Sequence, residues 1–199
     1  MLRVYHRDHA GRPVRVAWLL EELGEPYEVT VITSEEGKGE EHRARHPLGR
    51  VPVLEDDDGV LFESTAICLH LAEAHPDSGL LPPPGTRDRS IVHQWTIFAP
   101  AELEPRLIAA GTAMARDPET APPLRARFRD AATAVSDALD GNDFIVGDRL
   151  TVADMFLSTA LAFTARANLA DELAPNLQEY VARMGRRPAF QRAVARTSD

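Results

Sequence analysis

The stretch that most constrains how this chain can fold is residues 46–67, which read HPLGRVPVLEDDDGVLFESTAI. Two short apolar runs, at residues 51–54 and 60–62, flank a turn of three aspartates and one glycine. This pattern predicts a β-hairpin, and the polar residues that follow predict the start of a helix. Because proline cannot donate a hydrogen bond to a sheet, we expect Pro52 at the beginning of its strand.

The same stretch has two features suited to holding a small acidic peptide. The bond before a proline can be cis, and a cis bond before Pro52 would turn the backbone N–H and C=O of Val51 away from the sheet. Those groups would then be free to pair with an extended peptide, as an added strand does. Ser64 is a favourable N-cap residue, and its hydroxyl together with the free N–H groups of the first helical turn suits a carboxylate.

The sequence RVP at positions 50–52, followed by ESTAI at positions 63–67, resembles the glutathione transferase superfamily. Either motif alone also fits an ordinary strand start or helix cap, but their order and spacing favour the family. The resemblance implies a cis Val-Pro bond that holds the cysteinyl part of glutathione, and a Glu-Ser pair that binds its γ-glutamyl end. The glutathione-binding residues are then Arg50, Val51, Pro52, Glu63 and Ser64.

The first part of the chain alternates strands and helices. Strands are expected at residues 2–5 and 27–32, with a helix from Pro13 to Gly24 between them. The hairpin and a helix at residues 65–74 follow. This order predicts a parallel strand pair and an antiparallel hairpin, which together are the arrangement of the thioredoxin fold. The resemblance implies the same fold.

A segment rich in proline and glycine, DSGLLPPPGTR, marks a domain boundary. Beyond it the apolar periodicity is helical, and Pro100 and Pro105 should kink or interrupt the first of these helices. We therefore expect an α+β thioredoxin-like domain at residues 1–80, a linker at 81–87 and an all-α helical bundle at 88–199. The charged residues between the second strand and the hairpin are expected to be irregular or to form a mobile helix.

A capping box is predicted in the second domain, because Thr151 precedes Asp154 by the three residues that reciprocal capping requires. Leu150 and Met155 have the spacing of the accompanying hydrophobic staple. This box also recurs in the C-terminal domain of the glutathione transferase superfamily, so the resemblance extends over nearly the whole chain. The box contributes folding stability and no chemistry.

The chemistry of this family requires a group that stabilises the thiolate of bound glutathione. The resemblance places that group in the loop after the first strand, as Tyr, Ser or Cys. Here residues 6–12 read HRDHAGR, without serine, threonine or cysteine. Ala10 and Gly11 are the closest counterparts of a serine, and neither side chain can donate a hydrogen bond. A backbone N–H, the side chain of His9 or the positive charge of Arg12 could serve instead. His9 is the catalytic candidate because its imidazole can donate a hydrogen bond or carry charge; an exposed loop histidine is the alternative.

The acceptor is expected to be a small hydrophobic electrophile, bound between the two domains. Phe98, Leu103 and Leu107 on the first helix of the second domain are the candidate lining residues. Plain helix packing is the alternative interpretation for each of them.

Other features narrow the possible functions. The net charge of −9 disfavours a nucleic-acid partner, and no apolar run is long enough to span a membrane. The one cysteine, Cys68, lies in an apolar helix and is expected to be an inert core thiol, which suits the reducing cytoplasm. His42 and His46 have a spacing that could hold a metal, but no third ligand is evident, so no metal is expected.

The predicted function is a cytoplasmic glutathione transferase that joins the glutathione thiol to hydrophobic electrophiles, and the resemblance implies a homodimer. Two alternatives remain open. One is a non-catalytic glutathione-binding or regulatory module of the same fold. The other is a different glutathione-dependent enzyme, such as an isomerase, a dehalogenase or a disulfide reductase, the last being disfavoured because the loop has no cysteine.

Overall fold

The structure is a computed structural model of the 199-residue chain, and it describes residues 1–7 and 11–197. The fold divides into two compact units. Unit 1 comprises Met1–Ser78 together with Arg186–Asp199, and unit 2 is Gly79–Gly185. The expected division therefore differs from the structural one at the C-terminal end, where the last helix groups with unit 1.

A four-stranded sheet forms the centre of unit 1, with strand order β2-β1-β3-β4. Its strands are β1 Leu2–His6, β2 Tyr27–Val31, β3 Val53–Asp56 and β4 Gly59–Phe62. β1 runs parallel to β2 and antiparallel to β3, and β3 and β4 form the predicted antiparallel hairpin. The expected thioredoxin-like arrangement is confirmed.

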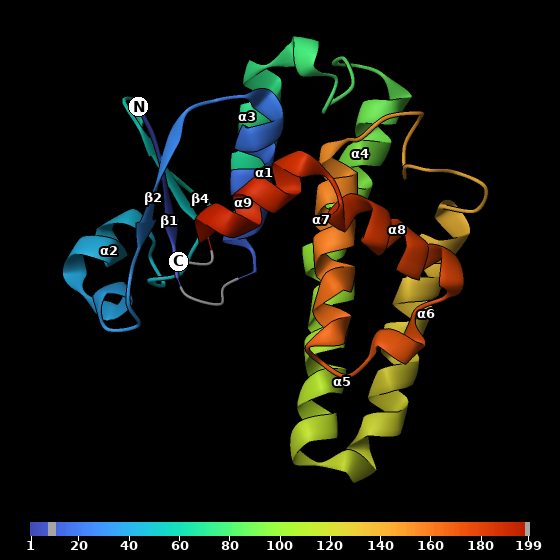
Figure 1. Cartoon of the computed structure of the whole chain (residues 1–199). Helices are drawn as coiled ribbons and strands as arrows, with labels where there is room; N and C mark the ends of the chain where they lie inside the picture. The colour runs from blue at the N-terminus through green and yellow to red at the C-terminus, as the bar shows by residue number, and fades with distance from the viewer. Residues whose placement is uncertain (8–10, 198–199) are drawn as a thin grey trace. The chain divides into compact units, whose positions relative to one another are not determined.

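Four α-helices pack around this sheet. They are α1 Pro13–Leu23, α2 Glu40–Arg45, α3 Ser64–Ala74 and α9 Pro188–Thr197. Figure 1 shows α1 and α3 on one side of the sheet and α2 on the other. The charged segment before the hairpin, expected to be irregular or helical, contains α2 and a short 3-10 turn at Glu36–Lys38.

The C-terminal helix α9 is anchored on α1 by apolar and ionic contacts. The rings of Trp18 and Phe190 meet edge to face with centroids 4.9 Å apart. The guanidinium of Arg187 donates to both carboxylate oxygens of Glu22, at 2.8 and 3.1 Å. Sequence periodicity alone assigned this helix to the second domain because periodicity does not reveal which partner a helical face packs against.

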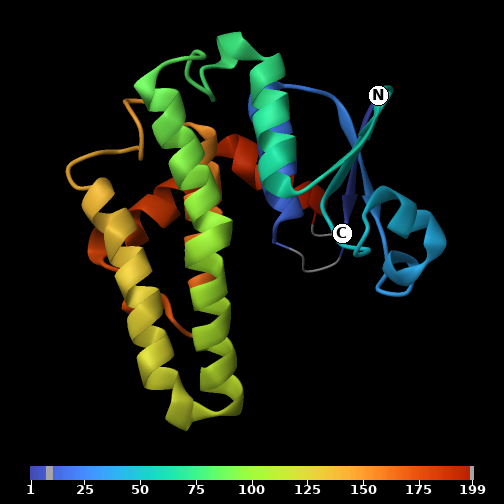
Figure 2. The same cartoon turned by 180° about the vertical axis from the view of Figure 1, so that it is seen from behind.

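Unit 2 is helical, as expected. Its α-helices are α4 Arg87–Phe98, α5 Glu104–Arg116, α6 Ala121–Ala138, α7 Val152–Ala162 and α8 Pro175–Gly185. A π-helical segment, Ala99–Leu103, joins α4 to α5, so the predicted interruption near Pro100 and Pro105 is confirmed. Figure 2 shows α4 and α5 following one another, with α6 running alongside α5.

The capping box at the start of α7 is present and is extended by further contacts. The carboxylate of Asp154 accepts hydrogen bonds from the backbone N–H and the hydroxyl of Thr151, at 2.8 and 2.9 Å. It also accepts from the N–H of Ile145 at 2.8 Å and from the hydroxyl of Tyr180 at 2.9 Å. Burial raises the pKa of Asp154, and these four hydrogen bonds oppose that shift by stabilising the ionised form.

Cys68 lies on α3 and is fully buried. Burial in an apolar environment raises the pKa of its thiol to about 12. The thiol is thus protonated at neutral pH, which agrees with the interpretation of an inert core cysteine.

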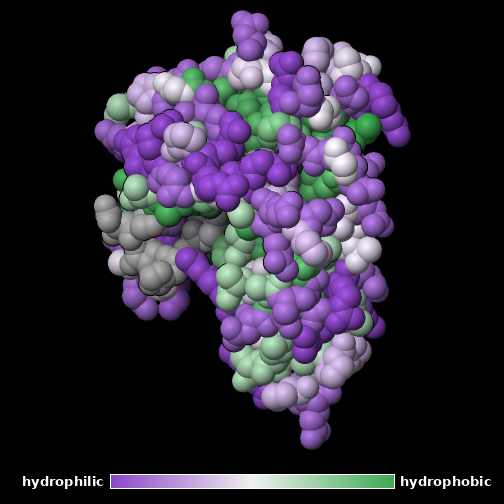
Figure 3. Space-filling model, turned by 45° about the vertical axis from the view of Figure 1, so that its right-hand side comes forward, coloured by the Kyte–Doolittle hydropathy of each residue, from purple (hydrophilic) through white to green (hydrophobic). Residues whose placement is uncertain are grey.

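The surface is largely hydrophilic on the face drawn in Figure 3, with apolar side chains interspersed between polar ones. Within residues 1–7 and 11–197, no helix combines the length and the hydropathy needed to cross a bilayer.

Candidate functional site

The bond between Val51 and Pro52 is cis, as expected. It immediately precedes β3, whose first residue, Val53, is paired on both sides. The side chain of Val51 packs against the buried residues Tyr5, Ile32 and Val53, while its backbone lies outside the strand. The backbone groups of Val51 are thus placed at an end of the sheet and are not used in its ladder.

Ser64 occupies a different helical position from the one expected. It is the first residue of α3, and Glu63 takes the N-cap position with a left-handed φ of 69°. The expected N-cap role of Ser64 is therefore wrong, because the chain enters the helix through Glu63. The side chain of Glu63 makes no capping hydrogen bond, so the first-turn N–H groups of α3 are left uncapped by it and suit a ligand.

Strand register brings the parts of the predicted site to one end of the sheet. In the hairpin, Val53 lies opposite Phe62, so continuing the same register outward leads to Val51 and Ser64 together. Between β1 and β3, Tyr5 lies opposite Val53, so the chain leaving β1 passes Val51 on its other side. The end of β1, the Val51–Pro52 segment and the start of α3 therefore lie at the same end of the sheet.

The loop expected to carry the thiol-activating group is described only in part. His9 and Ala10 lie outside the described residues, whereas Gly11 and Arg12 lead directly into α1. Tyr5 in β1 is buried and its hydroxyl donates to Glu55, and burial raises its pKa. This places Tyr5 in the core, as a strand tyrosine.

Two side chains hold the backbone just before Val51. The guanidinium Nη2 of Arg7 lies 3.2 Å from the carbonyl oxygen of Gly49. The imidazole Nε2 of His42 lies 2.9 Å from the carbonyl oxygen of Arg50. Neither contact is predictable from the sequence, because both join segments distant in the chain and no local motif marks them.

His42 and His46 are each hydrogen-bonded to the backbone. Nε2 of His42 forms a hydrogen bond with the Arg50 carbonyl oxygen, and Nδ1 of His46 accepts a hydrogen bond from the N–H of Leu48 at 3.1 Å. Burial lowers the pKa of His46, which favours its neutral form. Among the residues that the structure describes, no three His, Cys, Asp or Glu side chains are grouped to hold a metal ion.

The candidate lining residues of the acceptor pocket differ in exposure. Leu103 in the π-helical segment and Leu107 on α5 are buried, which fits the helix-packing alternative. Phe98 at the end of α4 is half-buried and meets the ring of Trp95 edge to face at 5.1 Å. Of the three, Phe98 has the most side-chain surface left for a ligand.

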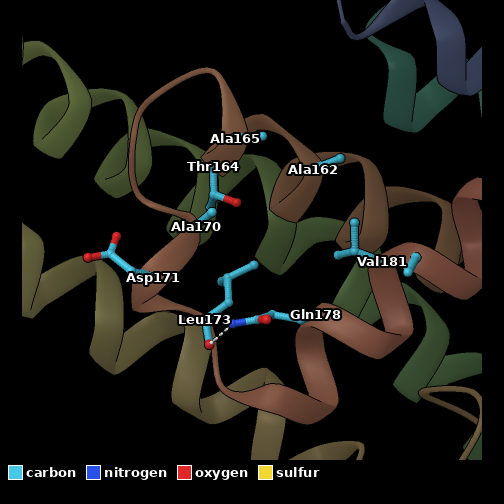
Figure 4. A pocket seen from close by; sticks show the side chains of 9 residues that line it. Ala162, Thr164, Ala165, Ala170, Asp171, Leu173, Gln178 and Val181 are labelled. Atoms are coloured by element: carbon cyan, nitrogen blue, oxygen red, sulfur yellow. Dashed lines mark hydrogen bonds between the residues drawn. The ribbon is translucent and has the colours of Figure 1, made fainter.

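Unit 2 also contains an open pocket of about 470 Å³ between the end of α7 and α8. Figure 4 shows it lined mainly by small and apolar side chains, with the amide of Gln178 turned back to donate to the carbonyl of Leu173 at 2.9 Å. Asp171 is the one charged side chain in the lining. The pocket contains none of the predicted site residues, and the hydroxyl of Thr164 in its lining donates to the carbonyl of Leu161 at 2.7 Å.

The fold is a thioredoxin-like unit with a cis-proline at one end of its sheet, together with a helical unit. Residues 2–73 match the family "Glutathione S-transferase, N-terminal domain", and residues 88–183 match "Glutathione S-transferase, C-terminal domain". The chain belongs to the glutathione S-transferase family.

Relatives and solved structures agree with this assignment. Glutathione S-transferase GstA of Escherichia coli O157:H7 is 32% identical over 162 residues, which cover 79% of this chain and 78% of the relative. Elongation factor 1-gamma of Trypanosoma cruzi is 34% identical over 129 residues, covering 63% of this chain and 30% of that protein. The crystal structure of a glutathione S-transferase from Actinobacillus pleuropneumoniae has a TM-score of 0.83 and 31% identity, covering 99% of this chain and 93% of its own.

Proposed function

We propose that the protein is a glutathione transferase, which joins the thiol of glutathione to a small hydrophobic electrophile. The observation that supports this most strongly is that the end of β1, the Val51–Pro52 segment and the start of α3 lie at one end of the sheet. In the proposed complex the backbone of Val51 pairs with the cysteinyl part of glutathione. Ser64, Glu63 and the free N–H groups of α3 bind the γ-glutamyl end, and Arg50 lies beside the tripeptide.

The test combines a binding measurement with a turnover measurement. At one hundred times Kd, glutathione should add about 2.7 kcal/mol to the free energy of unfolding. For a chain of this size that corresponds to a rise in Tm of roughly 5–11 °C. Conjugation of glutathione to 1-chloro-2,4-dinitrobenzene should then be measurable by absorbance. The absence of any shift at millimolar glutathione would contradict the proposal.

The thiol is proposed to be activated by His9 or by a backbone N–H of its loop. A neutral imidazole can donate one hydrogen bond to the sulfur, and the protonated form adds positive charge, so either favours the thiolate. Replacing His9 with alanine should raise the apparent pKa in the pH profile of kcat/KM for conjugation. An unchanged profile would assign the task to the backbone and remove His9 from the mechanism.

The second candidate is a glutathione-binding module without catalysis. The sequence of the loop favours it, because residues 7–11 contain no hydroxyl or thiol. The similarity to a protein named elongation factor 1-gamma is compatible with it as well. Stabilisation by glutathione without turnover of the aryl halide would identify this function.

We propose that the protein forms a homodimer in the cytoplasm. Supporting this, large apolar side chains are exposed in both units, and exposed apolar surface marks a protein interface where it is contiguous. They include Leu48 (62% exposed), Val60 (42%) and Phe62 (41%) in unit 1, and Ile97 (54%) and Ile108 (57%) in unit 2. Light scattering should give about twice the chain mass of 21.9 kDa, and a monomer mass would exclude the dimer.

A further inference from the structure

We propose that Arg7 and His42 position the glutathione-binding backbone by holding two consecutive carbonyl groups, those of Gly49 and Arg50. We call these two side chains the carbonyl clamp. The inference rests on the proposed function, because it concerns the affinity of the Val51 backbone for glutathione. It assigns positioning roles to two residues that the family motifs at positions 50–52 and 63–67 do not include.

The clamp joins three segments of the chain. Arg7 directly follows β1, at the start of the loop that is expected to carry the thiol-activating group. Its Nη2 donates to the Gly49 carbonyl at 3.2 Å. His42 lies on α2, and its Nε2 is 2.9 Å from the Arg50 carbonyl. Because a carbonyl oxygen can only accept, His42 must carry its proton on Nε2 when this bond forms. The peptide groups just before Val51 are thus held from two separate elements.

The planarity of the peptide bond gives the His42 contact its effect on the site. The carbonyl of Arg50 and the N–H of Val51 belong to the same peptide group, and in a trans peptide they point in opposite directions. Fixing the Arg50 carbonyl towards α2 therefore directs the Val51 N–H away from α2. That N–H is one of the two backbone groups proposed to pair with glutathione.

Close backbone packing around Arg7 leaves little freedom in this arrangement. A Cβ atom on Gly37 would lie 2.1 Å from Nη2 of Arg7, and one on Gly49 would lie 1.9 Å from the carbonyl oxygen of Gly37. Gly49 also has a left-handed φ of 62°. The glycines at positions 37 and 49 therefore allow the guanidinium to reach the Gly49 carbonyl, and a larger residue at either position would separate the segments.

The buried environment of His42 indicates that a polar side chain is present at this position because of its hydrogen bond to the Arg50 carbonyl. The residue is only 2% exposed, and its ring lies 5.8 Å from that of Tyr5. Its Nδ1 is buried and has no hydrogen-bond partner among the residues that the structure describes. An apolar ring could fill the same space at less cost, since burying an unpaired polar atom is unfavourable. The bond to Arg50 is the polar contact that an apolar ring would lose.

The test compares glutathione affinity in variants that keep or remove the His42 donor. His42→Phe preserves the ring and removes the donor, and it should raise the Kd for glutathione about three- to tenfold, the effect of one hydrogen bond. His42→Gln places an amide N–H near the position of Nε2 and should restore most of the affinity. In turnover assays the KM for glutathione should rise, while kcat and the KM for the electrophile stay unchanged.

His75→Phe is the matched control. His75 is in the same unit and also bonds a backbone carbonyl, that of Leu71 at 2.8 Å, but it lies at the far end of α3. It should lose some thermal stability and keep wild-type glutathione affinity. If His42→Phe binds glutathione as tightly as the unchanged protein does, the clamp is overturned while the proposed function stands. If the unchanged protein does not bind glutathione, the proposed function fails and the clamp fails with it.

Arg7→Met tests the other half of the clamp and does not depend on whether His42→Phe folds. Methionine retains the length of the side chain and removes the donor to Gly49, so the Kd for glutathione should again rise about three- to tenfold. Because both contacts hold one short segment, the effect of the double variant should fall short of the product of the two single effects. Unchanged affinity in Arg7→Met would remove Arg7 from the clamp.

Discussion

Replacing Asp154 with alanine is expected to lower the free energy of unfolding by about 4 kcal/mol. The carboxylate accepts four hydrogen bonds, two from backbone N–H groups and two from the hydroxyls of Thr151 and Tyr180. Removing the acceptor takes away the partner of the donors of Ile145 and Thr151, whereas the Tyr180 hydroxyl keeps the backbone carbonyl of residue 154 at 3.3 Å. Each buried donor left unpaired costs roughly 1–3 kcal/mol. Loss of the cap of α7 adds to the effect, and this helix is buried along nearly its whole length.

The measurement is thermal or urea unfolding followed by circular dichroism. The expected loss corresponds to a fall in Tm of roughly 8–16 °C. Asp130→Ala is the control, because Asp130 is an exposed aspartate on helix α6 of the same unit, and its removal should change stability by less than about 0.5 kcal/mol. A similar small change in Asp154→Ala would show that the network contributes nothing beyond the local helix propensity.

Local patterns were sufficient to predict most of the fold. The apolar runs around the Asp56–Gly59 turn specified the hairpin, and glycine, proline and capping residues marked the helix ends. Pro100 and Pro105 correctly predicted an interruption, but the π-helical form of that interruption depends on packing around it. The position of α9 on α1 was not predictable, because Trp18 and Phe190 are far apart in sequence.

The candidate site was predictable only where its residues are close in the chain. The Val51–Pro52 bond and the start of α3 were found from motifs, and the cis bond is confirmed. Ser64 was placed one position too early in its helix, because Glu63 adopts a left-handed φ that sequence preference disfavours for a non-glycine residue. The contacts of Arg7 and His42 depend on the packing of three segments, and no spacing rule describes that packing.

Replacing Ser64 with alanine is expected to raise the Kd for glutathione about 10- to 100-fold. The reason is the loss of a hydrogen bond from the hydroxyl to the ionised γ-glutamyl carboxylate, because bonds to charged groups contribute about 1.5–3 kcal/mol. The N–H groups at the start of α3 and the positive end of its dipole would remain, so binding should weaken without vanishing. Isothermal titration calorimetry with glutathione measures the change directly.

Ser158→Ala is the control for a general effect of removing a buried serine hydroxyl from a helix. Ser158 is on α7, and its hydroxyl donates to the carbonyl of Asp154 in the same helix, so its removal should leave glutathione affinity unchanged. An S-alkyl glutathione, such as S-hexylglutathione, should show the same loss in Ser64→Ala, because the thiol plays no part in this contact. Wild-type affinity of Ser64→Ala for both ligands would place the γ-glutamyl carboxylate elsewhere. In that case the convergence of the hairpin end and α3 would no longer support a glutathione site at Ser64.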